Sequence, residues 1–167
     1  MNDRDTADST PIAGQRTVLY GSTLTAEEAL AHSTQQSGRK SIPRHILLVE
    51  DDATLGTLEA EILRAYGYTT VTVESGELAI AALDHVIPDL VVLDLELTGP
   101  ISGWDVLHRL RSTAAIPVLI TSSSATAVRT YLRSCEETRF TLDHLPKPYP
   151  LQTLLKRIKR MLPINLY

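Results

Sequence analysis

Short aliphatic runs alternate with segments of helical periodicity from about residue 44 onward. Consecutive apolar positions in most of these runs are typical of strands that are covered on both faces. The pattern predicts five strands, and the fifth, which is more polar, is expected at an edge of the sheet. The five predicted strands are HILLVE (45–50), YTTVTV (68–73), DLVVLD (89–94), IPVLIT (116–121) and FTLDHL (140–145).

A helical segment follows each predicted strand. In the first one, Leu55, Leu58, Ile62 and Leu63 lie at helical spacing, and Gly67 supplies a stop signal. Alternation of strands and helices, with connections too long for hairpins, favours a parallel sheet. We therefore expect an α/β fold, a doubly wound five-stranded parallel sheet with helices on both faces. The other predicted helices are 76–86, 103–112, 125–138 and 150–162.

The first part of the chain, residues 1–43, has a different composition. Ser, Thr, Gln, Asp, Gly and Pro dominate it, and few of its residues could form a core. We interpret it as an N-terminal extension with one short helix after Thr25, because Thr25 and Glu28 form a capping-box pattern. The remaining chain divides into a domain at 44–162 and a tail at 163–167. So short a tail predicts a stand-alone protein that acts through partners.

Composition and charge narrow the class of protein. The hydrophobic fraction of 43% and the charged fraction of 22% are ordinary for a globular chain, and the net charge is −4. The basic clusters lack interleaved aromatic residues, so we do not expect a nucleic-acid partner. Cys135 is the single cysteine, and the apolar runs are far shorter than a membrane span. These features predict a cytoplasmic protein without a membrane partner.

Carboxylates gather where two of the predicted strands end. Glu50, Asp51 and Asp52 follow the first strand, and Asp94 ends the third. Parallel strands would bring these groups together at one edge of the sheet, where doubly wound folds bind ligands. One interpretation is that Asp52 caps the next helix while the other acids are solvated. The other is a Mg²⁺ site, because Mg²⁺ prefers hard oxygen ligands.

Two further polar features are predicted at the same edge. The fourth strand runs into TSSS, which includes Ser122, and the fifth is followed by Lys147. A lysine ammonium is a point charge that suits a phosphoryl oxygen, and a serine hydroxyl can donate to another. Each residue alone would be an ordinary loop residue. Their expected placement beside the carboxylates favours a site that handles a phosphoryl group.

Four segments carry a resemblance to a known family. ILLVEDD, VVLDLEL, PVLITSSS and KPY, in this order and at this spacing, resemble the motifs of the receiver domains of two-component response regulators. The resemblance covers residues 44 to 162 and is closest in character to stand-alone receivers of the chemotaxis-regulator type. It implies the flavodoxin-like receiver fold and a phospho-accepting signalling switch, not an enzyme that turns over a separate substrate.

The resemblance also implies roles for individual residues. Asp94 would be the nucleophile that takes a phosphoryl group from the phosphohistidine of a sensor histidine kinase. Glu50, Asp51, Asp94 and the backbone carbonyl of Glu96 would bind Mg²⁺, the expected cofactor. Lys147 would hold the phosphoryl oxygens. Downstream partners would be a target protein or a phosphotransfer protein, and a second copy of the chain is a further candidate.

The predicted switch residues are Ser122 and His144. Ser122 would turn toward the phosphoryl group, and we prefer it to Thr121 because of its spacing from Pro117 and the alternation of strand side chains. His144 occupies the place of the aromatic switch partner. It could rotate between buried and exposed positions and add a pH dependence. An exposed histidine at the strand edge is the alternative interpretation.

The chain departs from the family pattern at several places. Thr98 stands where proline is usual, and Gly103 comes nine residues after Asp94, which makes this loop one residue longer. The segment between Ser122 and Lys147 is about three residues longer than usual, and Phe140 and Thr141 replace a Gly-Ala pair. We expect the paths of these two segments to be the least transferable part of the resemblance.

Two other functions stay open on the sequence alone. A small phosphatase with an aspartyl nucleophile would have similar acidic strand ends and a second acid at the position of Glu96, whereas Lys-Pro-Tyr after the fifth strand favours the receiver. A degenerate receiver could act as a binding module only, although every key residue is present.

Overall fold

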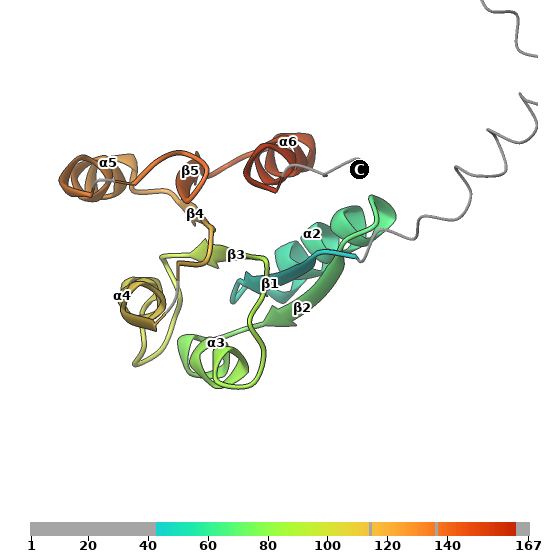
Figure 1. Cartoon of the computed structure of the whole chain (residues 1–167), viewed down its shortest axis with the longest axis horizontal. Coiled ribbons are helices and arrows are strands. Elements are labelled where there is room, and N and C mark those ends of the chain that lie inside the picture. Colours follow the sequence, from blue (N-terminus) through green and yellow to red (C-terminus); the bar gives the residue numbers. More distant parts are fainter. Residues whose placement is uncertain (1–42, 114, 136, 163–167) are drawn as a thin grey trace, which may run out of the picture. The chain divides into compact units, whose positions relative to one another are not determined.

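The computed structural model describes residues 43–113, 115–135 and 137–162 (Figure 1). Strands and helices alternate along this part of the chain, as the sequence predicts. None of the described helices combines the length and apolar character needed to cross a membrane. The short helix predicted after Thr25 lies outside the described residues. The elements are β1 (His45–Val49), α2 (Ala53–Ala65), β2 (Thr69–Val73), α3 (Gly76–Leu83), β3 (Leu90–Asp94), α4 (Gly103–Thr113), β4 (Val118–Ser122), α5 (Ala125–Ser134), β5 (Leu142–Pro146) and α6 (Leu151–Met161).

All five strands form one parallel sheet in the order β2-β1-β3-β4-β5. This order confirms the doubly wound fold and places β5 at an edge, as predicted. The winding direction reverses between β1 and β3, which lie side by side. The carboxyl ends of these two strands are therefore the expected location of a site in such a sheet.

Two apolar cores cover the two faces of the sheet. One packs the alternate side chains of β1, β3 and β4 that include Leu47, Val91 and Ile120 against α3, α4 and α5. The other packs the intervening side chains, such as Leu48 and Val92, against α2 and α6. Figure 1 shows α2 on the opposite side of the sheet from α3 and α4. Burial on both faces explains why the strand sequences are aliphatic at consecutive positions.

Several element ends differ from the sequence prediction. β5 begins at Leu142 because Phe140 and Thr141 belong to a turn, in which the Thr141 N–H donates to the Thr138 carbonyl at 3.0 Å. α5 ends at Ser134, and Cys135 has an extended backbone, so the helix predicted to reach residue 138 is shorter. α3 likewise ends at Leu83 instead of residue 86. Local turn geometry decides these ends, and hydrophobic periodicity does not encode it.

Two local features fix the elements around the carboxyl edge. Asp52 is the N-cap of α2, since its Oδ1 accepts hydrogen bonds from the backbone N–H groups of Thr54 and Leu55. Gly103 begins α4 in close contact with the end of β3. A Cβ atom at residue 103 would lie 2.1 Å from the carbonyl oxygen of Asp94. Only glycine allows this approach, which seats the start of α4 directly beside Asp94.

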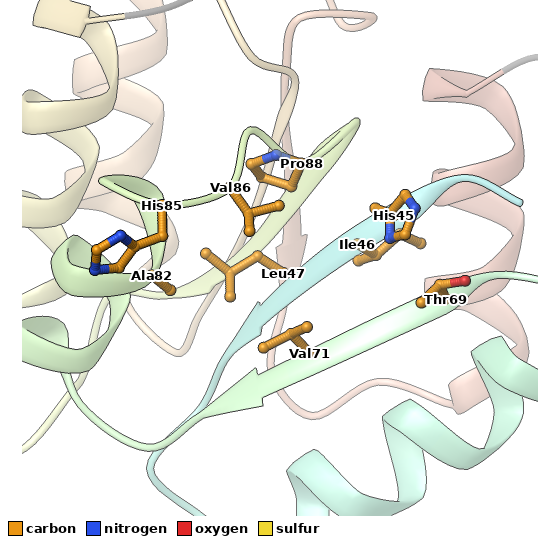
Figure 2. Close-up of a pocket in the computed structure, with 9 residues that line it drawn as sticks. All are labelled: His45, Ile46, Leu47, Thr69, Val71, Ala82, His85, Val86 and Pro88. Carbon is orange, nitrogen blue, oxygen red and sulfur yellow. The ribbon is translucent and has the colours of Figure 1, made fainter.

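An apolar groove of about 140 Å³ lies at the other end of the sheet (Figure 2). It is lined by the first residues of β1 and β2, among them His45 and Thr69, and by Val86 and Pro88 after α3. Because it opens at the amino ends of the strands, it is not part of the carboxylate edge.

Candidate functional site at the carboxyl ends of the strands

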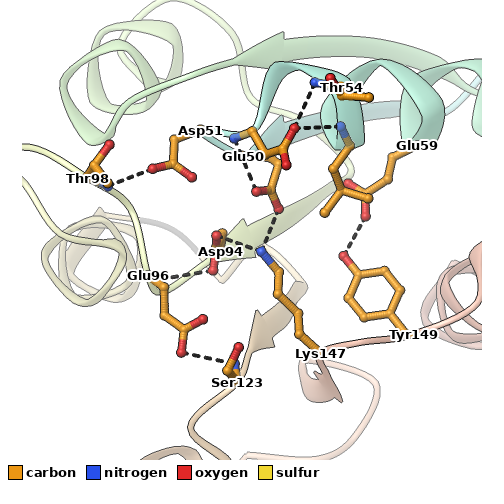
Figure 3. A network of polar contacts seen from close by, with 12 residues as sticks. Glu50, Asp51, Thr54, Glu59, Asp94, Glu96, Thr98, Ser123, Lys147 and Tyr149 are labelled. Atoms are coloured by element: carbon orange, nitrogen blue, oxygen red, sulfur yellow. Dashed lines mark hydrogen bonds and ion pairs between the residues drawn. The ribbon is translucent and has the colours of Figure 1, made fainter.

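The carboxylates of Glu50, Asp51 and Asp94 form a cluster. Each offers an oxygen atom, and these atoms lie within 4.8 Å of one another. Glu50 and Asp51 directly follow β1, and Asp94 is the last residue of β3, so the adjacency of the two strands produces the cluster (Figure 3). Glu50 and Asp94 are 3% and 2% exposed. The predicted gathering of acidic groups is therefore present in the fold.

Lys147 reaches the cluster from the residue after β5. Its Nζ lies 2.7 Å from Asp94 Oδ2 and 2.9 Å from Glu50 Oε2 (Figure 3). Partial burial lowers the pKa of Lys147, but its hydrogen bonds with Asp94 and Glu50 outweigh burial and raise the pKa above the ordinary value. The side chain is therefore an ammonium ion at neutral pH, held between two carboxylates.

Glu50 is in the opposite electrostatic situation. Burial raises its pKa above the ordinary value, and the nearby Asp94 charge adds to this effect, while Lys147 opposes it. Three carboxyl groups around one ammonium leave the cluster short of positive charge. A divalent cation or the protonation of one carboxyl group would relieve this imbalance.

Asp51 is held by the loop that follows β3. The backbone N–H of Thr98 donates to Asp51 Oδ2 at 2.9 Å (Figure 3). Partial burial raises the pKa of Asp51, but the Thr98 hydrogen bonds outweigh it and lower the pKa. Proline, which is usual at this position, has no N–H to donate. The departure noted in the sequence thus gives this chain a contact that proline would remove.

Glu96 spans the site from β3 toward β4. Its backbone N–H donates to Asp94 Oδ1 at 2.9 Å, and its Oε1 accepts from the Ser123 N–H at 3.0 Å. Slight burial raises the pKa of the Glu96 carboxyl, but the hydrogen bonds from Ser123 outweigh it and keep the pKa below the ordinary value. Both oxygens of Asp94 therefore have a donor, one from Glu96 and one from Lys147.

The two hydroxyl candidates on β4 differ in their surroundings. Thr121 pairs with Asp94 in the sheet register, whereas Ser122 pairs with Pro146. Ser122 is 1% exposed, and its Oγ accepts a hydrogen bond from the Ser124 N–H at 2.9 Å. In this arrangement the Ser122 hydroxyl is engaged with the loop after β4, and its role as the switch residue stays a prediction.

His144 lies on the edge strand β5, beside a cavity of about 390 Å³ between α5, β5 and α6. Its side chain is half-buried, and its Nε2 has no hydrogen-bond partner in the described part of the chain. Burial lowers the pKa of His144 below 6.5, so the ring is neutral near pH 7. Its role as a switch residue stays a prediction.

The structure adds two residues that the sequence analysis did not assign to the site. Glu59 of α2 is 1% exposed, and its Oε1 accepts a hydrogen bond from the Tyr149 hydroxyl at 2.5 Å (Figure 3). The sequence contains a pattern that could have identified Glu59, because this residue lies four residues after Leu55 and four before Leu63, on the predicted apolar face of the helix. An acidic residue at a core-facing position indicates a buried polar partner.

Comparisons with known proteins agree with the geometry of the site. Residues 46–159 match the model of the response regulator receiver domain family. The DNA-binding response regulator MtrA of Mycobacterium tuberculosis is 31% identical over 122 residues, which are 73% of this chain and 52% of MtrA. The sensory transduction protein RegX3 of the same species is 32% identical over 117 residues, 70% of this chain and 50% of RegX3. The chain thus spans about half the length of these curated relatives.

A comparison with solved structures supports the same fold. The chemotaxis response regulator CheY4 of Vibrio cholerae superimposes with a TM-score of 0.63 over 72% of this chain and 100% of CheY4, at 21% identity. At this identity the likeness concerns the fold alone. The match to the family model over residues 46–159 shows that the chain belongs to the response regulator receiver domain family.

Proposed function

We propose that the chain accepts a phosphoryl group on Asp94 from the phosphohistidine of a sensor histidine kinase, and that the modified protein signals through altered protein contacts. The observation that carries the proposal is the ammonium of Lys147, placed 2.7 Å from Asp94 and 2.9 Å from Glu50 inside the carboxylate cluster. This arrangement suits the transfer of an anionic group to Asp94, because the ammonium of Lys147 can pair with the phosphoryl oxygens once they are attached to Asp94.

The transfer itself is a displacement at phosphorus. An Oδ atom of Asp94 forms the new O–P bond while the P–N bond to the kinase histidine breaks, and the electron pair stays on the imidazole nitrogen. The product is an acyl phosphate on Asp94. Since the attacking and transferred groups are both anionic, the step depends on positioning and charge neutralisation. Lys147 supplies one positive charge, and the Glu96 N–H fixes the orientation of the Asp94 carboxylate.

The donor set fits Mg²⁺. Three carboxylates offer oxygen atoms within 4.8 Å of one another, and oxygen is the ligand atom that Mg²⁺ prefers. We propose that Glu50, Asp51, Asp94 and the backbone carbonyl of Glu96 hold the ion. When bound, Mg²⁺ supplies the charge neutralisation that the phosphoryl oxygens need beyond Lys147. The Thr98 N–H holds Asp51 in place for this role.

Signalling would begin at the loop after β4. At present the Ser122 Oγ accepts a hydrogen bond from the Ser124 N–H, and a phosphoryl group on Asp94 would give the Ser122 hydroxyl a charged acceptor to which it can donate. We propose that Ser122 leaves Ser124 for the phosphoryl group, which rearranges the start of α5. His144 on the neighbouring strand would then repack within the cavity between α5, β5 and α6.

We propose proteins, and not DNA, as the contacts of the receiver surface itself. Of the basic residues on α6, Arg157 and Arg160 both pair with the buried carboxylate of Asp143. This pairing reduces the free positive charge that a nucleic-acid backbone would need. The partners would be the kinase, a target protein or phosphotransfer protein, and a second copy of the chain, in the cytoplasm.

The phosphatase alternative depends on Glu96 as a general acid. A general acid must carry a proton, whereas the Ser123 hydrogen bonds keep the pKa of Glu96 below the ordinary value. This favours the receiver over a phosphatase that turns over external phosphomonoesters. A binding module without phosphorylation chemistry is the remaining alternative.

Transfer from an autophosphorylated histidine kinase, followed by intact mass measurement, tests the proposal. We expect the wild-type chain and Asp52→Asn to gain one phosphoryl group in the presence of Mg²⁺, and Asp94→Asn to gain none. Turnover of a phosphomonoester such as p-nitrophenyl phosphate by the wild type would favour the phosphatase. If neither the kinase nor acetyl phosphate produces a mass gain, the binding module without phosphorylation chemistry is the function that remains.

A further inference from the structure

A buried hydrogen bond joins α2 to the turn after β5. The Tyr149 hydroxyl donates to Glu59 Oε1 at 2.5 Å, and Glu59 is 1% exposed. The second oxygen of Glu59 is buried and has no hydrogen-bond partner in the described part of the chain. A buried carboxyl oxygen without a hydrogen-bond partner lowers the stability of the folded chain, so its presence calls for an explanation. Any role of this carboxyl group must therefore act through its hydrogen bond with Tyr149.

Tyr149 lies near Lys147 both along the chain and in the proposed phosphorylation site (Figure 3). Tyr149 is two residues after Lys147, whose Nζ is 2.7 Å from Asp94. Tyr149 is itself held by its hydrogen bond to Glu59 of α2. This bond anchors the segment after β5 that also carries Lys147.

We infer that Glu59 is a positioning residue for phosphoryl transfer, which through its hydrogen bond with Tyr149 fixes the turn that carries Lys147 and so holds the ammonium against Asp94. The inference rests on the proposed function of Asp94. The benefit is geometric, because phosphoryl transfer loses rate steeply when a charge-neutralising group is displaced by about 1 Å. Glu59 itself touches none of the reacting atoms.

The charge state of Glu59 follows from its surroundings. Burial raises its pKa to about 7, the Tyr149 hydrogen bond opposes burial, and the charges of Glu50 at the end of β1 and Asp94 at the end of β3 raise it further, while Lys147 lowers it. Burial and the nearby Glu59 raise the pKa of Tyr149, so its hydroxyl remains a donor. Near neutral pH the hydrogen bond exists with both charge states of Glu59.

The test compares three single variants and one double variant as purified full-length chains, with acetyl phosphate as donor and saturating Mg²⁺. Tyr149→Phe keeps the ring and loses the donor, Glu59→Leu loses the acceptor, and Glu59→Gln keeps an acceptor of the same shape. We expect the phosphorylation rate constant to fall about tenfold in Tyr149→Phe and Glu59→Leu, and Glu59→Gln to stay within about twofold of wild type at pH 6. The double variant Glu59→Leu with Tyr149→Phe should lose no more than either single one.

A merely structural role would give a different result. Because Glu59→Leu leaves the Tyr149 hydroxyl without its acceptor, thermal unfolding of every variant is measured, and rate constants are compared at a temperature at which all variants are folded. A variant that is fully folded and still slow shows that the loss of rate does not come from unfolding. Glu61→Gln, an exposed change on the same helix, is the control and should match wild type. Above pH 7 the ionised Glu59 adds negative charge near Asp94, so the wild-type rate constant should fall relative to that of Glu59→Gln.

Two outcomes would overturn the inference while leaving the proposed function intact. One is a wild-type rate constant in both Tyr149→Phe and Glu59→Leu. The other is an equal loss in Glu59→Gln and Glu59→Leu at pH 6, which would show that the hydrogen bond is not what matters. If the wild-type chain itself accepts no phosphoryl group, the proposed function fails and the inference fails with it.

Discussion

Glu59→Gln should change how the stability of the protein depends on pH. In the folded chain burial raises the pKa of Glu59 from its ordinary value of 4.5 to about 7. Between these values the unfolded chain releases the proton and the folded chain keeps it, so the free energy of unfolding decreases as pH rises through this window. At about 1.4 kcal/mol for each pH unit, the whole difference is worth about 3 kcal/mol.

Glutamine copies the protonated state of Glu59. Its oxygen can accept from Tyr149, and its amide cannot ionise, so the variant should not show this loss. The two proteins should be equally stable near pH 4, and Glu59→Gln should be more stable by about 3 kcal/mol near pH 8. Such a difference is a large part of the total of about 5–15 kcal/mol that is typical of a domain.

Urea unfolding at a series of pH values, followed by the fluorescence of the single tryptophan, Trp104, measures this difference. A chelator keeps divalent ions out of the carboxylate cluster. The other carboxyl groups titrate in both proteins, so subtraction removes their contribution. Glu61→Gln, on the exposed face of α2, should give a curve parallel to wild type. A constant difference between wild type and Glu59→Gln from pH 4 to 8 would refute the reasoning, because it would mean that Glu59 has an ordinary pKa.

Three further substitutions test other contacts. Thr98→Pro removes the backbone N–H that donates to Asp51 Oδ2 at 2.9 Å, so a metal titration should show about tenfold weaker Mg²⁺ binding. Thr98→Ala, which keeps the N–H, is the control. Unchanged Mg²⁺ binding in Thr98→Pro would show that the contact has no role. Gly103→Ala would place a Cβ atom 2.1 Å from the Asp94 carbonyl oxygen, and we expect a loss of at least about 2 kcal/mol in urea unfolding, which a wild-type midpoint would contradict. The pKa of His144 is lowered in the folded chain, so as pH falls below 6.5 the unfolded chain takes up a proton first and the free energy of unfolding decreases. His144→Phe should therefore lose less free energy of unfolding than wild type on acidification. An equal loss in both proteins would exclude His144 as the cause.

The sequence could predict the parts of the site that depend on periodicity and topology. The aliphatic runs predicted parallel strands, and parallel strands necessarily bring Asp51 and Asp94 to one edge of the sheet. The capping role of Asp52 followed from its place before a helix and is confirmed by its hydrogen bonds to Thr54 and Leu55. These features need no knowledge of side-chain packing.

Contacts that depend on loop paths and side-chain directions could not be predicted in this way. The backbone N–H of Thr98 reaches Asp51 only because of the particular path of the loop after β3. Likewise, periodicity placed Glu59 on the buried face of α2, but it could not show that Tyr149, ninety residues further along, supplies the hydrogen bond. The start of β5 moved to Leu142 because a local turn holds Thr141.

The central claim is that Asp94 receives the phosphoryl group, and reductive trapping of an acyl phosphate tests it most directly. The wild-type chain is incubated with acetyl phosphate and Mg²⁺, reduced with borohydride and digested, and the modified residue is located by mass spectrometry. We predict that the reduced position is Asp94, that the reaction needs Mg²⁺, and that Lys147→Met lowers its yield sharply. Trapping at Asp51, Asp52 or Glu96, or no trapping at any residue, would contradict the account.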